Sequence, residues 1–403
     1  MDFPWPLRMI LLLSILSVIS LGYLSTHLIS IAKRSERTLI KLSLAVFTFM
    51  LLLISFIYPI SGVIIEISGG SFNYADFPRS LIYSFWYGLA AGVTMMNFLL
   101  LADFASLFSR IFFKIDRTER LFWKEKGILV TLPLVLLYVA ATMFGDTQRI
   151  EVRNSEVTLT DSAPSAYSSY TLRIVHISDI QADRFTTPEK MNRYITKVNE
   201  AQPDMVVFTG DLVTSGTDYF DEGADALAQI NAKSGVYSVM GDHDFWSSPE
   251  LYRSSLKRAN SHLLEDSVMR IQHEDLTIAL AGITEIYSQK IGDERLRNLL
   301  SDSLMQTSDL RLVISHQANE RVVNASEESG AVDIVLGGHT HGGQMALPFM
   351  NKLWNPSTLE TPYEAGNYRV GELFINVNVG LGFTLTPIRY HVPAEVSVID
   401  VVY

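Results

Sequence analysis

Four long apolar stretches in the first third of the 403-residue chain constrain its fold more than any other feature. They cover about residues 10–32, 39–65, 81–109 and 121–144. Each is at or near the roughly 20 residues that an α-helix needs to cross a bilayer. Buried helices of a soluble core would not account for four such lengths in succession. The sequence therefore predicts an all-α transmembrane region of four helices over residues 1–144.

The basic residues of the connecting loops predict how these helices are oriented. Ten lysines and arginines lie in the first and third connections, whereas the N-terminus and second connection hold only Arg8 and Arg79. Short cytoplasmic loops carry the excess of Lys and Arg. We therefore expect a multi-pass protein of the cell (plasma) membrane, with everything after residue 145 on the extracytoplasmic side.

Charge is divided unequally along the chain. Residues 1–144 hold 12 Lys and Arg against 8 Asp and Glu, whereas residues 145–403 hold 20 against 35. Nucleic-acid surfaces need clustered cations, so the acidic second part predicts no nucleic-acid partner. The chain has no cysteine, which excludes a disulfide framework, a cysteine nucleophile and a thiolate metal site.

The sequence after the fourth stretch predicts a linker and then an α/β domain. Residues 145–170 are polar and rich in Ser and Thr, with room for one edge strand. From residue 171 to 403, short apolar runs alternate with helical stretches, a pattern typical of a sheet covered by helices. The expected helices cover about 188–201, 221–231, 248–259, 292–300 and 317–327. The expected strands are Leu172–Ile177, Met205–Phe208, Gly235–Met240, Leu276–Ala281, Leu310–Ile314, Val332–Leu336, Leu373–Val377 and Val396–Val402.

Polar clusters follow five of these strands. Because ligand sites of α/β sheets lie beyond the carboxyl ends of strands, we expect the clusters to converge. A single member could be a helix cap or a buried histidine, but agreement among five strand ends favours a site. The residues expected there are Asp179, Gln181, Asp211, Asp242, His243, His316, His339 and His341.

The last cluster, GGHTHGGQ at residues 337–344, indicates metal binding. His339 and His341 are two residues apart, so on an extended segment both imidazoles point the same way. Flanking glycines let the backbone turn and approach a bound group closely. Carboxylates mixed with imidazoles suit Mn, Fe, Zn or Mg. Seven candidate ligands are too many for one ion and suit two divalent metal ions that share a carboxylate, an arrangement used to attack phosphorus.

The order of these clusters resembles the calcineurin-like metallophosphoesterase superfamily. The chain has D-x-Q, GD, GDHD, H and GHTH where that family has D-x-H, G-D-x-x-D, G-N-H-D/E, H and G-H-x-H. The GHTHGGQ segment and Gly380-Leu381-Gly382 before Pro387-Ile388-Arg389 resemble its bacterial membrane-associated phosphodiesterase branch. The resemblance covers about residues 171–403. It implies a β-sandwich flanked by helices, within the α/β class, and a metal-dependent hydrolase acting on phosphoric ester bonds.

The resemblance also implies a role for each clustered residue. Asp211 would bridge the two ions, and His243 would be the catalytic residue, bound to a phosphoryl oxygen or the leaving group. One metal would be held by Asp179, Gln181, Asp211 and His341, and the other by Asp211, Asp242, His316 and His339.

Three positions depart from the family pattern. Gln181 replaces a ligand histidine, Thr214 replaces the aspartate that orients the catalytic histidine, and Asp242 replaces an asparagine. The last two exchanges move one negative charge onto the second metal and leave the total unchanged. We expect that metal to be a weaker Lewis acid and His243 to be less readily protonated.

These features favour a membrane-anchored dinuclear metal-dependent phosphoesterase, acting on phosphodiester, phosphomonoester or diphosphate bonds. The alternative is a catalytically weakened, membrane-tethered metal-binding sensor or scaffold. A lipid-linked substrate is expected because four spans exceed what tethering needs. The apolar segment 345–354 beside the metal loop would contact lipid, with Phe349 and Trp354 as substrate-binding residues. A core-packing loop is the other interpretation of that segment.

Overall fold

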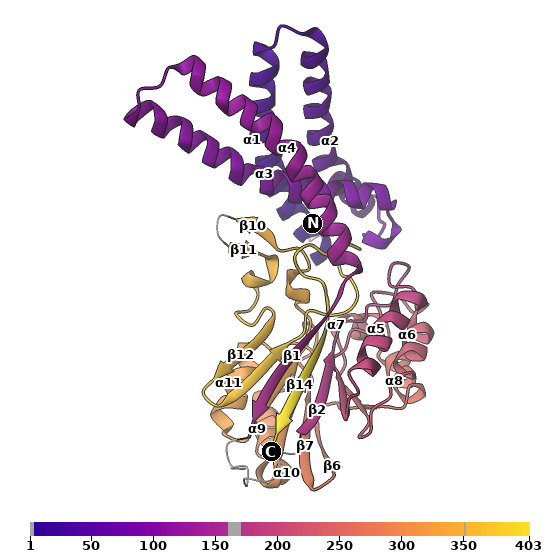
Figure 1. Cartoon of the computed structure of the whole chain (residues 1–403). Coiled ribbons are helices and arrows are strands. Elements are labelled where there is room, and N and C mark those ends of the chain that lie inside the picture. Colours follow the sequence, from indigo (N-terminus) through magenta and orange to yellow (C-terminus); the bar gives the residue numbers. More distant parts are fainter. Residues whose placement is uncertain (1–3, 160–170, 350–351) are drawn as a thin grey trace. The chain divides into compact units, whose positions relative to one another are not determined.

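The computed structural model describes residues 4–159, 171–349 and 352–403. Residues 160–170 of the expected linker, and Met350 and Asn351 of the apolar segment, lie outside the described residues. The chain forms two compact units (Figure 1). Unit 1 is Met1–Gly145 with Leu347–Trp354, and unit 2 is Asp146–Ala346 with Asn355–Tyr403.

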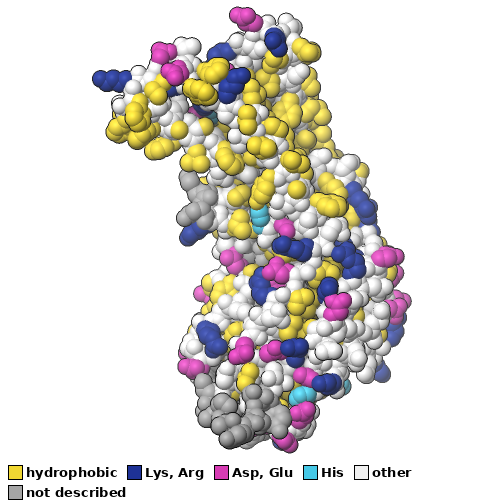
Figure 2. Space-filling model, viewed as in Figure 1, with side chains coloured by type: hydrophobic (Ala, Val, Ile, Leu, Met, Phe, Trp, Pro, Cys, Tyr) yellow, Lys and Arg dark blue, Asp and Glu magenta, His cyan; other side chains and the backbone are white. Residues whose placement is uncertain are grey.

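Unit 1 is built from four long helices, which confirms the predicted number of candidate spans. Each is long and apolar enough to cross a membrane. Many of their exposed side chains are hydrophobic (Figure 2). Phe104 and Leu137, for example, are 66% and 68% exposed. Such a surface is suited to lipid contact rather than to water. The helices are α1 (Trp5–Arg34), α2 (Thr38–Ile67), α3 (Arg79–Phe112) and α4 (Arg117–Gln148), with a 3₁₀ turn at Tyr74–Asp76.

A short hairpin also belongs to unit 1. Its strands β10 (Leu347–Phe349) and β11 (Lys352–Trp354) pair in antiparallel register. Asn97 of α3 donates its side-chain amide to the carbonyl oxygen of Pro348 at 2.8 Å. A polar amide on an apolar helix needs such a partner, because an unsatisfied one is costly in lipid.

Unit 2 contains two six-stranded mixed sheets, each with helices on its outer face (Figure 1). The first sheet has the order β1-β14-β2-β3-β4-β5 and the second β12-β13-β9-β8-β7-β6. Strands of the first are β1 (Ile150–Thr158), β2 (Thr171–Ile177), β3 (Met205–Phe208), β4 (Val236–Ser238), β5 (Ser261–Leu263) and β14 (Ala394–Val402). Strands of the second are β6 (Ser267–His273), β7 (Leu276–Ile283), β8 (Leu310–Ser315), β9 (Ile334–Gly337), β12 (Gly366–Val370) and β13 (Leu373–Val377).

The strands contribute side chains to three apolar layers, one between the two sheets and one between each sheet and its outer helices. On β2, Leu172 and Ile174 pack between the two sheets, whereas Val175 and Ile177 pack against the outer helices. Neighbouring side chains of a strand point to opposite faces, so both faces of a buried strand must be apolar.

The helices beside the first sheet are α5 (Pro188–Glu200), α6 (Phe220–Leu227), α7 (Asp242–Ser247) and α8 (Pro249–Arg258). Those beside the second are α9 (Asp293–Leu300), α10 (Ser303–Thr307) and α11 (Glu320–Ser329), and 3₁₀ turns lie at His341–Gly343 and Pro356–Leu359. The expected helix-flanked sandwich is confirmed.

The segment expected as a linker contains an edge strand of the first sheet. β1 pairs in parallel with β14 from Ile150↔Ala394 to Thr158↔Val402. α4 continues to Gln148, so only Arg149 separates the last long helix from the sheet.

Candidate metal centre

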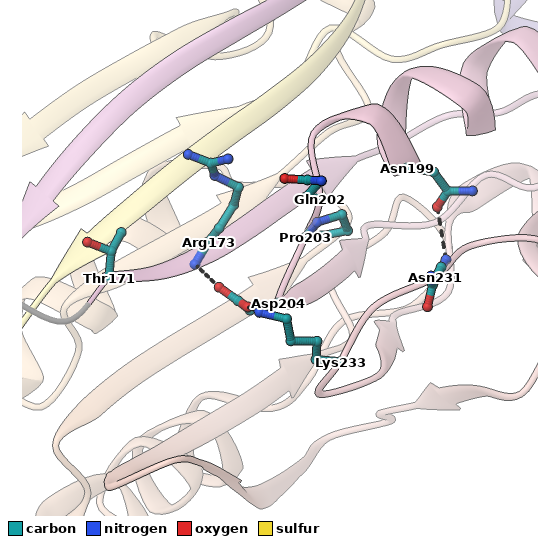
Figure 3. Close-up of a pocket in the computed structure, with 8 residues that line it drawn as sticks. All are labelled: Thr171, Arg173, Asn199, Gln202, Pro203, Asp204, Asn231 and Lys233. Carbon is teal, nitrogen blue, oxygen red and sulfur yellow. Dashed lines mark hydrogen bonds and ion pairs between the residues drawn. The ribbon is translucent and has the colours of Figure 1, made fainter.

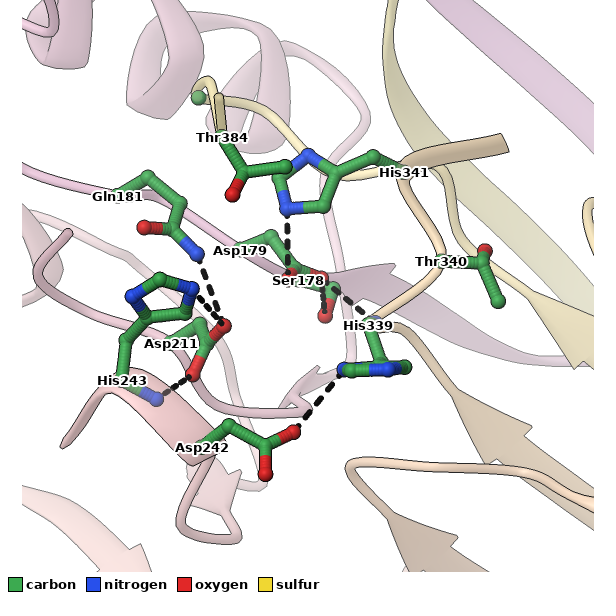
Figure 4. A network of polar contacts seen from close by, with 12 residues as sticks. Ser178, Asp179, Gln181, Asp211, Asp242, His243, His339, Thr340, His341 and Thr384 are labelled. Atoms are coloured by element: carbon green, nitrogen blue, oxygen red, sulfur yellow. Dashed lines mark hydrogen bonds and ion pairs between the residues drawn. The ribbon is translucent and has the colours of Figure 1, made fainter. Parts of the chain in front are cut away.

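The turns that follow β2, β3, β4, β8 and β9 bring the predicted polar clusters together (Figure 4). His316, which follows β8, lies at the middle of the group. Its Nε2 atom is 3.4 Å from Oδ2 of Asp211 and 3.4 Å from Oδ2 of Asp242. The first carboxylate comes from the first sheet's β3 turn and the second begins α7 after β4. Side chains from both sheets therefore meet at one point.

One half of the centre is formed by Asp242, His316 and His339, whose ligand atoms lie within 4.8 Å of one another. Nδ1 of His339 is 3.0 Å from Oδ2 of Asp242 and 3.3 Å from Nε2 of His316. Imidazole nitrogens and a carboxylate oxygen at this spacing match the donor set of a divalent transition metal.

Hydrogen bonds outside this half determine which ring nitrogen of each histidine faces inward. Nδ1 of His316 lies 2.7 Å from the backbone oxygen of Thr209, so it donates there and leaves Nε2 facing the carboxylates of Asp211 and Asp242. Nε2 of His339 lies 2.9 Å from the Glu360 carboxylate, which leaves Nδ1 facing Asp242. Metal-binding histidines normally have their second nitrogen held in this way.

The other half contains Asp179, Gln181, Asp211 and His341. Nε2 of His341 is 3.1 Å from Oδ1 of Asp179, and Nε2 of Gln181 donates to Oδ2 of Asp211 at 2.8 Å. Oε1 of Gln181 and Nδ1 of His341 are buried and have no hydrogen-bond partner among the described residues. Ligand atoms of Asp179 and Asp211 in this half and of His316 lie within 4.8 Å of one another, a spacing that suits binding of one divalent cation. The residues of this half therefore fit a metal ion.

Three carboxylates give the centre a negative potential. Burial alone would lower the pKa of His316, but the charge of Asp211, followed by those of Asp179 and Asp242, raises it well above the usual value. Burial likewise opposes protonation of His339, yet its hydrogen bonds to Asp242 and Glu360 raise its pKa to about 9. A field that attracts protons to imidazoles also attracts divalent cations.

Five candidate ligands have left-handed backbone conformations. Their φ angles lie between 50° and 72° for Asp179, Gln181, Asp211, His339 and His341. Few non-glycine residues adopt positive φ, and such strain concentrates at functional sites. Close approach adds a second constraint: a Cβ atom on Gly338 would lie 1.8 Å from Oγ of Ser178. The GGHTHGGQ segment therefore needs glycine at this position.

His243 lies at the edge of the centre, in α7. Its Nε2 atom is 4.0 Å from Oδ2 of Asp211, and its Nδ1 atom is 2.5 Å from the backbone oxygen of Thr214. The Thr214 hydroxyl instead donates to the backbone carbonyl oxygen of Gln181 at 3.1 Å. The main chain of Thr214 thus orients His243, although its side chain carries no charge for that purpose.

Several residues that the motifs did not single out support the ligands. Asp244, fully buried, accepts hydrogen bonds from the backbone N–H groups of Asp211, Leu212 and Gly241 at 2.8, 2.8 and 3.1 Å. Asp244 thus fixes the turn that carries Asp211. Its position as the last residue of the GDHD motif could have identified it from the sequence. Glu360 follows a 3₁₀ turn in a segment with no motif, so nothing in the sequence pointed to it.

Further supporting contacts come from backbone groups and from a buried arginine. The backbone N–H of Tyr287 donates to Oδ1 of Asp242 at 2.6 Å, and Nε2 of Gln317 donates to Oδ2 of the same carboxylate at 3.0 Å. The buried guanidinium of Arg389 donates to the carbonyl oxygens of Gly380 and Gly382 at 3.0 and 2.7 Å. A Cβ atom on Gly380 would lie 2.7 Å from Cβ of Asp179, so Arg389 holds the turn that packs against this ligand.

The two predicted substrate-binding residues are located outside this centre, in the hairpin of unit 1. Phe349 is 49% exposed, and Trp354 is partly buried. A separate cavity of about 540 Å³ in unit 2 is lined by residues of β2, the α5–β3 turn and the segment before β4 (Figure 3). The two basic side chains that line this cavity are in ion pairs, Arg173 with Asp400 and Lys233 with Asp204.

Comparison with known proteins agrees with this geometry. A family model described as calcineurin-like phosphoesterase matches residues 172–343. The uncharacterized metallophosphoesterase YkuE of Bacillus subtilis is 30% identical over 228 residues, which cover 56% of this chain and 77% of that protein. The chain therefore belongs to the calcineurin-like phosphoesterase family and is a phosphoesterase hydrolase.

Two further relatives carry related names. The transmembrane protein with metallophosphoesterase domain of Danio rerio is 29% identical over 237 residues, covering 56% of this chain and 52% of that protein. The uncharacterized metallophosphoesterase Cj0846 of Campylobacter jejuni is 26% identical over 303 residues, covering 74% and 75% of the two chains.

Proposed function

We propose that this protein is a membrane-anchored phosphoesterase that uses two divalent metal ions bridged by Asp211. The observation that carries the proposal is the position of Asp211 between the two halves. Its Oδ2 atom is 2.8 Å from Nε2 of Gln181 on one side and 3.4 Å from Nε2 of His316 on the other. When bound, two divalent ions would supply Lewis acidity and an activated nucleophile at neutral pH.

His243 would donate a proton to the leaving group. The Thr214 carbonyl accepts from Nδ1 and thereby orients the ring, so that Nε2 faces the side of the centre next to Asp211. The carbonyl oxygen fixes the orientation of the ring as a carboxylate would. We therefore expect His243 to remain useful as a proton donor.

The first test is hydrolysis by the purified full-length protein with Mn added. A panel of aryl phosphodiesters, nucleotides and lipid phosphates should include at least one substrate whose turnover is lost when the metal is chelated. Two bound ions without turnover of any member would favour the alternative, a metal-binding sensor or scaffold.

A lipid-linked substrate is the narrower part of the proposal, and the hairpin supports it. β10 and β11 pack with the membrane helices in unit 1, and Pro348 accepts a hydrogen bond from Asn97 of α3. The same segment begins three residues after Gln344, the last residue of the GGHTHGGQ segment. The metal loop is thus continuous with an apolar element of the membrane unit. Phe349 and Trp354 would contact the acyl or isoprenoid chain of the substrate.

Changing Phe349 and Trp354 together to Ser tests the role of the hairpin. The KM for a lipid phosphate should rise, while a small soluble aryl phosphodiester should be turned over as before. Equal loss on both substrates would assign the hairpin a structural role instead.

We also propose that unit 2 is extracytoplasmic, on the basis of the basic loops. Single cysteines at Ser35, before α2, and at exposed Thr158, in β1, suit this otherwise cysteine-free chain. An impermeant thiol reagent added to intact cells should label the second position and spare the first. The reverse pattern would place the domain in the cytoplasm.

A further inference from the structure

Two aromatic rings beside the metal centre are held in place but left open to solvent. Trp246 of α7 is 51% exposed, and Tyr287, which follows β7, is 43% exposed. Their planes are parallel within 1°, and their centroids are 6.4 Å apart. Large apolar rings that remain exposed on a folded domain commonly mark a contact surface.

Both rings are fixed by hydrogen bonds. Nε1 of Trp246 donates to Oγ of Ser288 at 2.6 Å. Tyr287 is held at both ends, since its backbone N–H donates to Asp242 and its hydroxyl donates to Glu360. Rings that are already immobilised lose little further conformational entropy when a ligand stacks on them. Rigid exposed rings are thus better suited to binding than to filling space.

The two rings also touch the histidines of the centre. The ring of Trp246 lies edge-on to His243 at 5.3 Å between centroids, and that of Tyr287 lies edge-on to His339 at 5.0 Å. His243 is the proposed proton donor to the leaving group. A leaving group within reach of His243 is therefore next to Trp246 as well.

We infer that Trp246 and Tyr287 bind a planar aromatic leaving group, so that the preferred substrates are phosphoesters of an aryl or nucleobase-bearing group. This inference rests on the proposed role of His243 and deepens the proposed function. It concerns only the leaving group and holds for any group on the other side of the phosphorus. Aromatic platforms accept many planar groups, because every such group has a π face.

Substitution of Trp246 separates stacking from a structural role. Two methyl phosphodiesters serve as substrates, one with a p-nitrophenyl and one with a trifluoroethyl leaving group. Trp246→Leu should raise KM for the aryl diester about 5- to 150-fold, the range that a lost stacking contact produces, with little change in kcat. The alkyl diester should be unaffected, and Trp246→Phe should restore most of the aryl affinity. Trp123→Leu, which changes a 65% exposed ring of α4, is the matched control.

Equal loss on both diesters, or unchanged KM for the aryl diester, would overturn the inference. A binding measurement makes the test independent of turnover. Calorimetric titration of the metal-loaded protein should give tighter binding of phenylphosphonate than of methylphosphonate, and Trp246→Leu should abolish the difference. Equal affinities in the unchanged protein would refute the aromatic site even if the enzyme is active. If no diester is hydrolysed but phenylphosphonate is preferred, the proposed function fails while the aromatic site stands.

Discussion

The two halves of the candidate centre differ in how firmly their side chains are held. On one side, Nε2 of His316 and Nδ1 of His339 face inward because Thr209 and Glu360 accept hydrogen bonds from their other nitrogens. On the other side, His341 has a buried nitrogen without a partner among the described residues, and the Gln181 amide donates to Asp211. One half is thus preorganised, whereas in the other half the Gln181 amide would have to turn before it could coordinate.

This difference shows which half of the centre depends on Gln181 for metal binding and which half does not. To coordinate a cation, Gln181 would have to present Oε1, a neutral oxygen, in place of the amide nitrogen that now faces Asp211. The half built on Asp242, His316 and His339 does not depend on that residue. We therefore expect two metal sites of unequal affinity joined at Asp211, and four substitutions can break or sharpen that contrast.

Asp211→Asn should have the largest effect, because Asp211 is the proposed bridge between the two ions. Both sites should lose metal, and kcat/KM should fall at least ~10³-fold, more than is typical for removal of a single stabilising contact. Asp218→Asn, an exposed carboxylate of the same loop, is the control. A variant that keeps one tightly bound ion would show that Asp211 serves only one half.

His243→Ala should lower kcat by about 10²–10⁴, the usual range for a positioned proton donor, and should leave both metals bound. His243 contacts the centre from its edge, with Nε2 4.0 Å from Asp211, so its loss removes no ligand. Metal analysis and steady-state kinetics on the same preparation separate the two effects. Normal turnover in a metal-replete variant would exclude His243 from the chemistry.

Glu360→Gln should lower the metal affinity of the half formed by Asp242, His316 and His339 and leave the affinity of the other half unchanged. The change replaces the charged carboxylate that accepts from His339 with a neutral amide, a weaker acceptor, and weakening of such a partner typically costs 10–100-fold in metal affinity. Competition titration with a chelator should show a shift for the tighter site only. Glu372→Gln, an exposed carboxylate after β12, should change neither site. A shift of the weaker site instead would reverse the assignment of the two halves.

Gln181→His should have the smallest effect and the opposite sign. An imidazole in place of the amide should tighten the weaker site by about 10-fold and bring the two affinities closer together. The same chelator competition measures this change. Unchanged titration curves would show that residue 181 does not coordinate.

Central strands were predictable from the sequence, whereas the edge strands other than β1 were not. β2, β3, β8 and β13 are buried on both faces and appear as apolar runs. In contrast, β5 and β12 lie at sheet edges and are short or mostly polar, as in Gly366–Val370. β6, the other edge of the second sheet, has only two buried residues, Ile271 and His273, and was also missed. An edge strand has one solvated side, so its sequence lacks the continuous apolar signal.

The ligands of the centre were predictable because strand ends place them, but their supports were not. Asp179, Asp211 and Asp242 lie two to four residues beyond the ends of β2, β3 and β4, so the order of the strands brings them to one edge of the sheet. Glu360 reaches His339 from a segment between β11 and β12 that no periodicity defines. The tautomer of each histidine depends on such long-range contacts, so it could be obtained only from the structure.

The most direct test of the central claim is the metal content of the wild-type protein. After loading with Mn and removal of free ions, elemental analysis should give two ions per chain. Stepwise chelation should then remove one ion before the other, with hydrolysis lost at the first step. One ion or fewer per chain under saturating conditions would contradict a dinuclear centre bridged by Asp211.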